Sequence, residues 1–208
     1  MAMKRFPITN VEGDLVAQHR DPDEKLYASL ELNQVAFPKT GMVVSQTPLG
    51  PKFVKGGSGN YGVCENGMWV VADKAAGVID APAAATDAPI GIVYTTEKEY
   101  DREHYGLQRF GRKIAGDYPR VGIFGLGDTV TTNCLQYDDA EFATFAALEA
   151  DLKALDATHP MYVKAVAGSA VPQLTKNKPT EGTYAKVTKY YTIPNGGLGV
   201  KYQIVSLG

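Results

Sequence analysis

The residues that most often carry enzyme chemistry occur here without the neighbours that such chemistry needs. Ser58 lies in Gly56-Gly57-Ser58-Gly59-Asn60, which begins like the Gly-x-Ser-x-Gly turn of serine hydrolases, but Asn60 replaces the last glycine and no helix is predicted after it. Gly125-Leu126-Gly127 lacks the third glycine of a dinucleotide-binding loop and precedes a predicted strand, whereas phosphate is held at a helix N-terminus. These motifs therefore predict neither a nucleophile nor a nucleotide cofactor.

The histidines and cysteines show no spacing that is typical of a metal site. His19, His104 and His159 lie far apart, and none belongs to a His-x-His, His-x-x-His or His-Glu-x-x-His pattern. We interpret His159, just before a proline, as a cation at the end of a helix. Cys64 and Cys134 have no Cys-x-x-Cys partner and are expected to be separate buried thiols. We therefore expect no metal, no cofactor and no enzymatic activity.

Charge and hydropathy exclude further classes of partner. The 208 residues include 21 basic and 23 acidic side chains, a net charge of −2, which is too balanced for an obligate nucleic-acid or anionic-membrane binder. The longest apolar runs, such as Met68–Ala72, are far shorter than the roughly 20 residues that cross a bilayer. The stretch Phe6–Asp14 lacks the apolar core of a secretory signal. We therefore expect a soluble protein that binds neither nucleic acid nor membrane.

From residue 41 onward the pattern predicts a mainly β body, a small barrel or sandwich of short antiparallel strands. Strands are expected at 42–45, 61–64, 68–72, 90–95, 121–124, 129–135, 161–166, 187–193 and 198–205. Three hairpins are expected, with turns at Asn66-Gly67, at Gly125–Asp128 and at Pro194–Gly197. Glycine, proline and β-branched residues favour strand and loop over helix in the alanine-rich segment 72–88.

One amphipathic helix is expected near residues 139–156. Asp138 or Asp139 is the predicted N-cap, and Pro160 marks the end of the helical pattern. The apolar residues of this segment recur at intervals of three and four, which predicts one buried face: Phe142, Phe145, Leu148, Leu152 and Leu155.

Residues 1–40 differ from the body, residues 41–208, and are expected to form an extended N-terminal arm. Half of the residues from Glu12 to Lys25 are charged, and no helical or strand period is sustained. The arm is nonetheless richer in apolar residues than a solvated tail. Its predicted partner-binding anchors are Phe6, Ile8, Leu30, Leu32 and Phe37. The arm either orders on a neighbouring subunit or remains disordered or packed on its own body.

Four segments of the body resemble the head decoration and auxiliary capsid proteins of tailed bacteriophages. They are GVCENGMWVVAD at 62–73, APIGIV at 88–93, PRVGIFGLGDTV at 119–130 and PNGGLGVKY at 194–202. The resemblance extends over roughly residues 40–208. It implies a non-enzymatic structural protein on the capsid surface of a virion, made in the host cytoplasm. It also implies binding to the major capsid protein as a homo-oligomer, with a trimer favoured.

Two other classes of function remain open on the sequence. A carbohydrate- or receptor-binding β module, such as a head fibre or tail component, would use exposed aromatic rings. Trp69 is the discriminating residue for that class, although its position between Met68 and Val70 favours core packing. An enzyme with a scattered active site would instead require polar residues that the fold brings together in a pocket.

Overall fold

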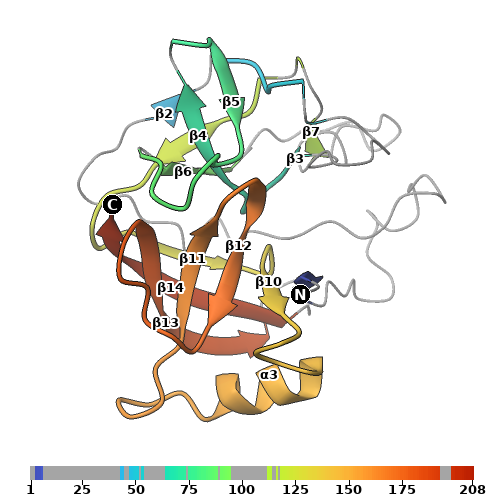
Figure 1. The fold of residues 1–208 in the computed structure, drawn as a ribbon, viewed down its shortest axis with the longest axis vertical. Helices are drawn as coiled ribbons and strands as arrows, with labels where there is room; N and C mark the ends of the chain where they lie inside the picture. The colour runs from blue at the N-terminus through green and yellow to red at the C-terminus, as the bar shows by residue number, and fades with distance from the viewer. Residues whose placement is uncertain are drawn as a thin grey trace, which may run out of the picture.

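The computed structural model describes a mainly β protein with two large sheets, one short strand pair and a helix (Figure 1), and this confirms the predicted fold class. The described residues are 3–6, 43–44, 47–51, 53, 64–73, 75–88, 90–94, 112–113, 116, 118–192 and 198–208.

The larger sheet has seven strands in the order β1-β10-β12-β11-β13-β14-β9. They are β1 Met3–Arg5, β9 Thr129–Thr132, β10 Gln136–Asp138, β11 Tyr162–Val166, β12 Ser169–Thr175, β13 Thr183–Thr192 and β14 Leu198–Leu207. Neighbouring strands are antiparallel except β10 and β12, which are parallel. A parallel pair needs a long connection, and here the chain between the two strands includes the helix α3 (Phe145–Lys153) and β11.

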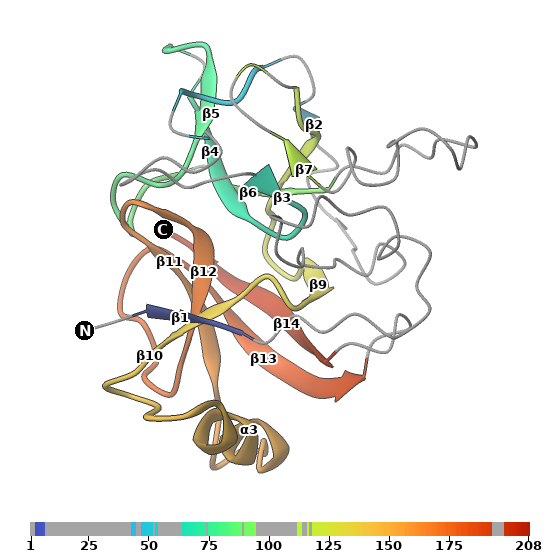
Figure 2. The ribbon, with the colours of Figure 1, turned by 90° about the vertical axis from the view of Figure 1, so that its right-hand side faces the viewer.

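The smaller sheet has five strands in the order β2-β8-β6-β4-β5, and β3 and β7 form a separate pair. Their bounds are β2 Val43–Val44, β3 Cys64–Glu65, β4 Trp69–Asp73, β5 Val78–Asp80, β6 Ile90–Val93, β7 Arg112–Lys113 and β8 Val121–Ile123. The five-stranded sheet and α3 lie at opposite ends of the molecule, with the seven-stranded sheet between them (Figures 1 and 2).

An aromatic cluster joins the two sheets. Trp69 of β4 is 1% exposed and stands edge to face with Phe124 and with Tyr202 of β14, at ring-centroid distances of 5.2 and 5.8 Å. Its indole Nε1 donates a hydrogen bond of 2.9 Å to the Tyr202 hydroxyl. Trp69 therefore belongs to the core, as its apolar neighbours predicted, and it offers no ring face to a sugar.

The C-terminal hairpin of β13 and β14 is confirmed, and so are the strands at β6 and β11. The turn at 194–197 lies outside the described residues. The alanine-rich segment forms the short strand β5 and a loop, as glycine and proline predicted. That loop packs closely against the turn before β13. The approach is so close that an added Cβ at Gly182 would collide with the carbonyl oxygen of Ala85.

The helix is shorter than predicted and begins later. It spans Phe145–Lys153, and its N-cap is Thr144, whose Oγ1 accepts a hydrogen bond of 3.2 Å from the Ala147 amide. Asp138 instead caps a turn, where its Oδ1 accepts from the Ala140 amide at 2.9 Å. The predicted N-cap at 138–139 was wrong because a short polar side chain stabilises turns as well as it stabilises helix ends.

The hairpin predicted at Asn66-Gly67 is wrong. A turn does form there, closed by a 3.3 Å bond from the Met68 amide to the Glu65 carbonyl, but β3 pairs with β7, and β4 pairs with β5 and β6. Gly67 has a φ of +93° while Asn66 has a negative φ, the pattern of a type II turn. Such a turn splays the flanking strands, whereas the predicted type I′ turn would match their twist.

The hairpin predicted around Gly125–Asp128 is also wrong, because the chain changes sheets there. β8 before it belongs to the five-stranded sheet and β9 after it to the seven-stranded sheet. Asp128 fixes the crossing: its Oδ2 accepts from the Gly125 amide at 2.6 Å, and its backbone oxygen accepts from the Ile204 amide at 2.8 Å. Asp128 is fully buried, and its Oδ1 has no hydrogen-bond partner among the described residues.

Candidate functional site

The outer face of the seven-stranded sheet gathers lysines and tyrosines from β11, β13 and β14. Residues directly opposite one another in neighbouring strands share a face. Lys164 lies opposite Tyr184, Tyr162 lies opposite Lys186, and Lys189 lies opposite Lys201. We call this surface the lysine–tyrosine face, and its members are Tyr162, Lys164, Tyr184, Lys186, Lys189, Tyr191 and Lys201.

The opposite face of the same strands is part of the apolar core. Val163 of β11, Val187 of β13 and Val200 of β14 are buried there with residues from β4, β6 and α3. The sheet is therefore two-sided, with one face in the core and one outside. This arrangement explains the alternation of apolar and polar residues that predicted the C-terminal strands.

A β-bulge at Thr188 sets which residues of β13 point outward. Val187 pairs with Tyr202 and Lys189 pairs with Lys201, so β13 advances by two residues where β14 advances by one. The Thr188 hydroxyl donates to the carbonyl oxygen of Lys201 at 3.1 Å and so holds the bulge. Lys189 therefore lies on the outer face, where simple alternation after Val187 would have turned it into the core.

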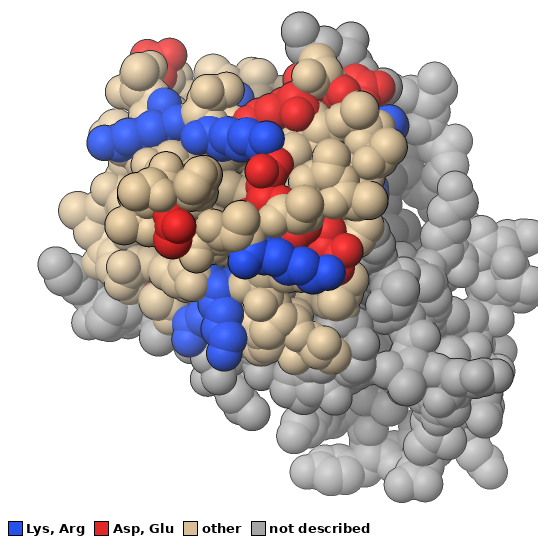
Figure 3. All heavy atoms as spheres, turned by 90° about the horizontal axis from the view of Figure 1, so that it is seen from below, with Lys and Arg blue, Asp and Glu red and all other residues tan. Residues whose placement is uncertain are grey.

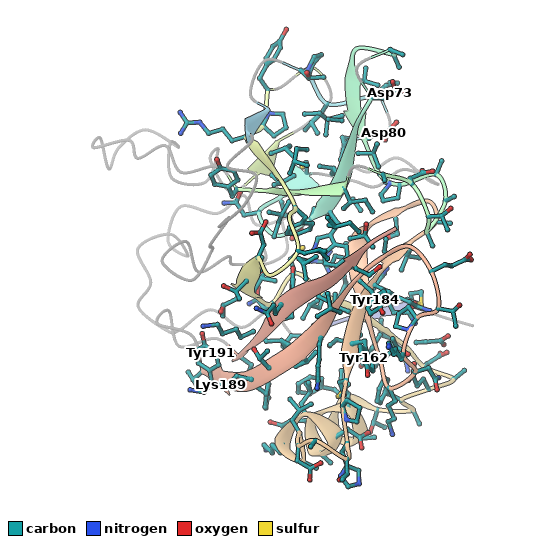
Figure 4. The ribbon with its side chains drawn as sticks, turned by 90° about the vertical axis from the view of Figure 1, so that its left-hand side faces the viewer. Asp73, Asp80, Tyr162, Tyr184, Lys189 and Tyr191 are labelled. Atoms are coloured by element: carbon teal, nitrogen blue, oxygen red, sulfur yellow. The ribbon has the colours of Figure 1, made fainter. Side chains whose placement is uncertain are left out.

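The tyrosine rings of the face are held by their neighbours (Figure 4). Tyr162 and Tyr184 stand edge to face, with ring centroids 6.2 Å apart and planes at 75°. The Lys189 ammonium lies 4.9 Å from the centroid of the Tyr191 ring, and the Tyr191 hydroxyl donates to Thr131 Oγ1 at 3.1 Å. The rings form a fixed, partly buried floor, from which the exposed side chains of Lys186 and Lys189 project.

The face has one sign of charge. The strands β9, β11, β12, β13 and β14 contain four lysines and no acidic residue. At the end of the molecule that carries α3, basic and acidic side chains lie side by side (Figure 3). Ion pairs join them there, from Lys153 to Glu149 at 3.0 Å and from Lys176 to Asp151 at 2.6 Å.

The structure places the first predicted arm anchor, Phe6, in the core of its own chain. Phe6 is 1% exposed, its amide donates to the Leu135 carbonyl at 2.8 Å, and its ring lies 5.3 Å from that of Phe145 and 6.4 Å from that of Tyr190. Residues 3–5 form the edge strand β1, which pairs with β10 (Figure 2). Met3–Phe6 thus belong to the body, and Phe6 is not available to a partner. The other anchors, Ile8, Leu30, Leu32 and Phe37, lie outside the described residues.

Arg5 fastens β1 to the neighbouring strand pair. Its Nη2 lies 3.1 Å from Glu65 Oε2 of β3 and 4.0 Å from the Cys134 Sγ. The carboxyl end of β1 is therefore held by an ion pair as well as by Phe6, within the segment that the sequence predicted to be an extended arm.

The two cysteines are free and buried, as predicted. Burial raises the pKa of the Cys134 thiol to about 12, because the thiolate would have no water around it. Within the described ranges, no group of three histidine, cysteine, aspartate or glutamate side chains could hold a metal ion. His159 lies beyond the end of α3 and contacts Asp156, with Nδ1 3.2 Å from Oδ1, so its predicted role at a helix end was wrong.

A search of family models, curated proteins and solved structures found no match to this chain. In the part of the chain that the structure describes, no helix is long and apolar enough to cross a membrane.

Sequence reasoning did not identify the lysine–tyrosine face. Alternation in β14 places Lys201 and Gln203 on one side, and that signal was present in the sequence. The bulge at Thr188 gave no comparable signal, because one inserted residue reverses the alternation without changing composition. The pairing of β11 with β13 joins segments about 20 residues apart and cannot be read from one sequence.

Proposed function

We propose that this protein is a non-enzymatic structural component of a virion that binds the assembled capsid lattice as a decoration protein and stabilises the head. Its partner in this proposal is the major capsid protein, and it acts as a homo-oligomer, with a trimer favoured. It would be made in the host cytoplasm and reside on the capsid surface.

The observation that carries the proposal is the lysine–tyrosine face. This surface comes from a rigid sheet whose other side is the core, and the rings of Tyr162, Tyr184 and Tyr191 are fixed by contacts with their neighbours. Tyrosine is enriched in protein interfaces, and a preorganised surface loses little conformational entropy when it binds. A rigid outer face of this kind suits a protein that binds another protein.

The segments that resemble decoration proteins support the same class. Parts of GVCENGMWVVAD, APIGIV and PRVGIFGLGDTV form β4, β6 and β8, which are consecutive in the five-stranded sheet. Segments far apart in the sequence thus contribute to one structural unit, as a resemblance of fold would require.

Stabilisation of a capsid follows from mass action. A protein that binds the assembled lattice, and not its free subunits, shifts the equilibrium toward the lattice. Many copies on one particle, each held weakly, add their effects because the lattice sites are linked.

The experiment is quantitative mass spectrometry of gradient-purified particles of the virus that encodes the chain. We expect the ratio of this chain to the major capsid protein to match the number of equivalent binding sites on the lattice. Absence of the chain from the particles would refute the proposal. A handful of copies would refute the decoration role and assign the chain to a vertex or the tail.

A further inference from the structure

We infer that the lysine–tyrosine face docks onto a carboxylate-rich protein surface. In the proposed function this surface belongs to the major capsid protein of the lattice, so the identity of the partner depends on that proposal. The chemistry of the docking does not depend on it.

Three lysines of the face are available for a partner. Lys164, Lys186 and Lys189 form no ion pair with any residue that the structure describes. This contrasts with Lys153 and Lys176 near α3, whose ammonium groups are paired with Glu149 and Asp151. The fold therefore pairs Lys153 and Lys176 near α3, and it leaves these three lysines of the sheet without an ion pair to any described residue.

The charge of the face is opposite in sign to the net charge of the rest of the chain. The chain has 21 basic and 23 acidic residues, so that without the four lysines of the face 17 basic residues stand against 23 acidic ones. The face is thus a positive surface on a negative molecule. A positive face on a chain of net negative charge favours the orientation in which that face meets an acidic surface.

Nucleic acid is the competing polyanion, and the tyrosines argue against it. Single strands are held by stacking bases on open ring faces. Here Tyr162 and Tyr184 stand edge to face, and the Lys189 ammonium covers one face of the Tyr191 ring. A nucleic-acid strand that extends beyond the face would also approach the rest of the chain, whose net charge is negative. A compact acidic protein surface meets neither obstacle.

The spacing of the lysines fits a flat acidic partner. Lys164 and Lys186 are diagonal neighbours on β11 and β13, about 7–8 Å apart at the backbone. Lys189 and Lys201 are directly opposite one another farther along the same sheet. Carboxylates distributed over a surface can pair with each of them, whereas a single carboxylate can reach only one or two.

The test compares two variants that carry four substitutions each and have the same net charge. The face variant combines Lys164→Gln, Lys186→Gln, Lys189→Gln and Lys201→Gln. The control variant changes four lysines outside the face: Lys4→Gln, Lys153→Gln, Lys176→Gln and Lys178→Gln. Binding of each full-length protein is measured to particles stripped of the chain, to immobilised poly-L-glutamate and to a single-stranded dT oligonucleotide, at low and physiological salt.

We expect wild type and control variant to bind the particles and poly-L-glutamate at low salt, and the face variant to bind both at least about tenfold more weakly. Raising the salt should remove most of this difference, since exposed charges are screened over about 8 Å at physiological ionic strength. Equal binding by the face and control variants would overturn the inference. Tighter binding to dT than to poly-L-glutamate, lost in the face variant, would overturn it in favour of nucleic acid.

The outcomes separate the two proposals. If wild type does not bind particles but binds poly-L-glutamate through the face, the virion role fails and the docking chemistry stands. If wild type binds particles and the face variant binds equally well at every salt concentration, the virion role stands and the docking inference fails. Should the fourfold variant not fold by circular dichroism, the double variant Lys186→Gln/Lys189→Gln, which changes the two exposed lysines only, gives the same comparison against Lys176→Gln/Lys178→Gln.

Discussion

Replacing Tyr202 by phenylalanine tests the junction on which the two-sheet architecture depends. The Tyr202 hydroxyl accepts the hydrogen bond of the Trp69 indole at 2.9 Å, and both side chains are at most 1% exposed. The Tyr202→Phe variant keeps the ring and its packing but removes the acceptor. The Trp69 N–H is then left buried without a partner.

The expected loss follows from that unsatisfied donor. A buried donor without a partner costs about 1–3 kcal/mol. For a chain of this length each kcal/mol lowers the melting temperature by about 2–4 °C, so that Tyr202→Phe should melt roughly 2–12 °C below wild type. The loss applies to the whole body, because the bond joins β4 of one sheet to β14 of the other.

The assay is equilibrium unfolding followed by the fluorescence of Trp69, which is the only tryptophan in the chain. Unfolding exposes the indole to water and shifts its emission to longer wavelength. The matched control is Tyr118→Phe, because Tyr118 is 59% exposed. Removing its hydroxyl should change the unfolding free energy by less than about 0.5 kcal/mol. If Tyr202→Phe unfolds at the wild-type midpoint with an unchanged circular dichroism spectrum, the hydrogen bond between the sheets does not exist.

Three further predictions concern the N-terminal strand, a turn and a buried carboxyl group. Phe6→Ala should lose about 3–5 kcal/mol of unfolding free energy in denaturant titration, because the ring is part of the core; unchanged stability would return Phe6 to a partner-binding arm. Gly77→Ala should lose about 1–2 kcal/mol from its left-handed backbone alone, and Gly182→Ala should lose more, because its Cβ also meets a neighbouring loop; equal losses would contradict that contact. Burial raises the pKa of Asp128, so the folded state binds its proton more tightly than the unfolded chain does. The protonated Asp128 carboxyl group therefore stabilises the fold at low pH, and this stabilisation is lost as the pH rises above about 4. The unfolding free energy of wild type, measured relative to that of Asp128→Asn, should fall over the same pH range.

Local pattern predicted those parts of the fold whose pairing is local in the sequence. The hairpin of β13 and β14 was predicted from alternating apolar residues around Pro194–Gly197, since both strands and their turn lie within 25 residues. The turn at Asn66-Gly67 formed as well, but its strands separated because each found partners far away in the sequence. Periodicity indicates where a strand is, and the tertiary structure decides with which strand it pairs.

The strand β12 illustrates a second limit. Pro172 has no amide hydrogen and would ordinarily exclude a central strand, yet β12 lies between β10 and β11. The register with β11 shifts between Lys164 and Val166, opposite the segment that contains Pro172. A proline is tolerated at such an irregularity because the ladder bond that it would break is not made there. The sequence alone does not reveal that irregularity.

The bulge at Thr188 connects the candidate site with the packing of the core. Beyond it the outward residues are Lys189 and Tyr191, and Tyr190 turns inward, where its ring meets Phe6 at 6.4 Å and its hydroxyl donates to Glu149 Oε1 at 2.8 Å. Without the inserted residue, alternation would turn Tyr190 outward and bury the Lys189 ammonium, which is costly without a partner. One residue thus both places two members of the lysine–tyrosine face and supplies the ring on which the N-terminal strand packs. Because the same backbone irregularity serves both, the lysine–tyrosine face and the anchoring of β1 cannot vary independently.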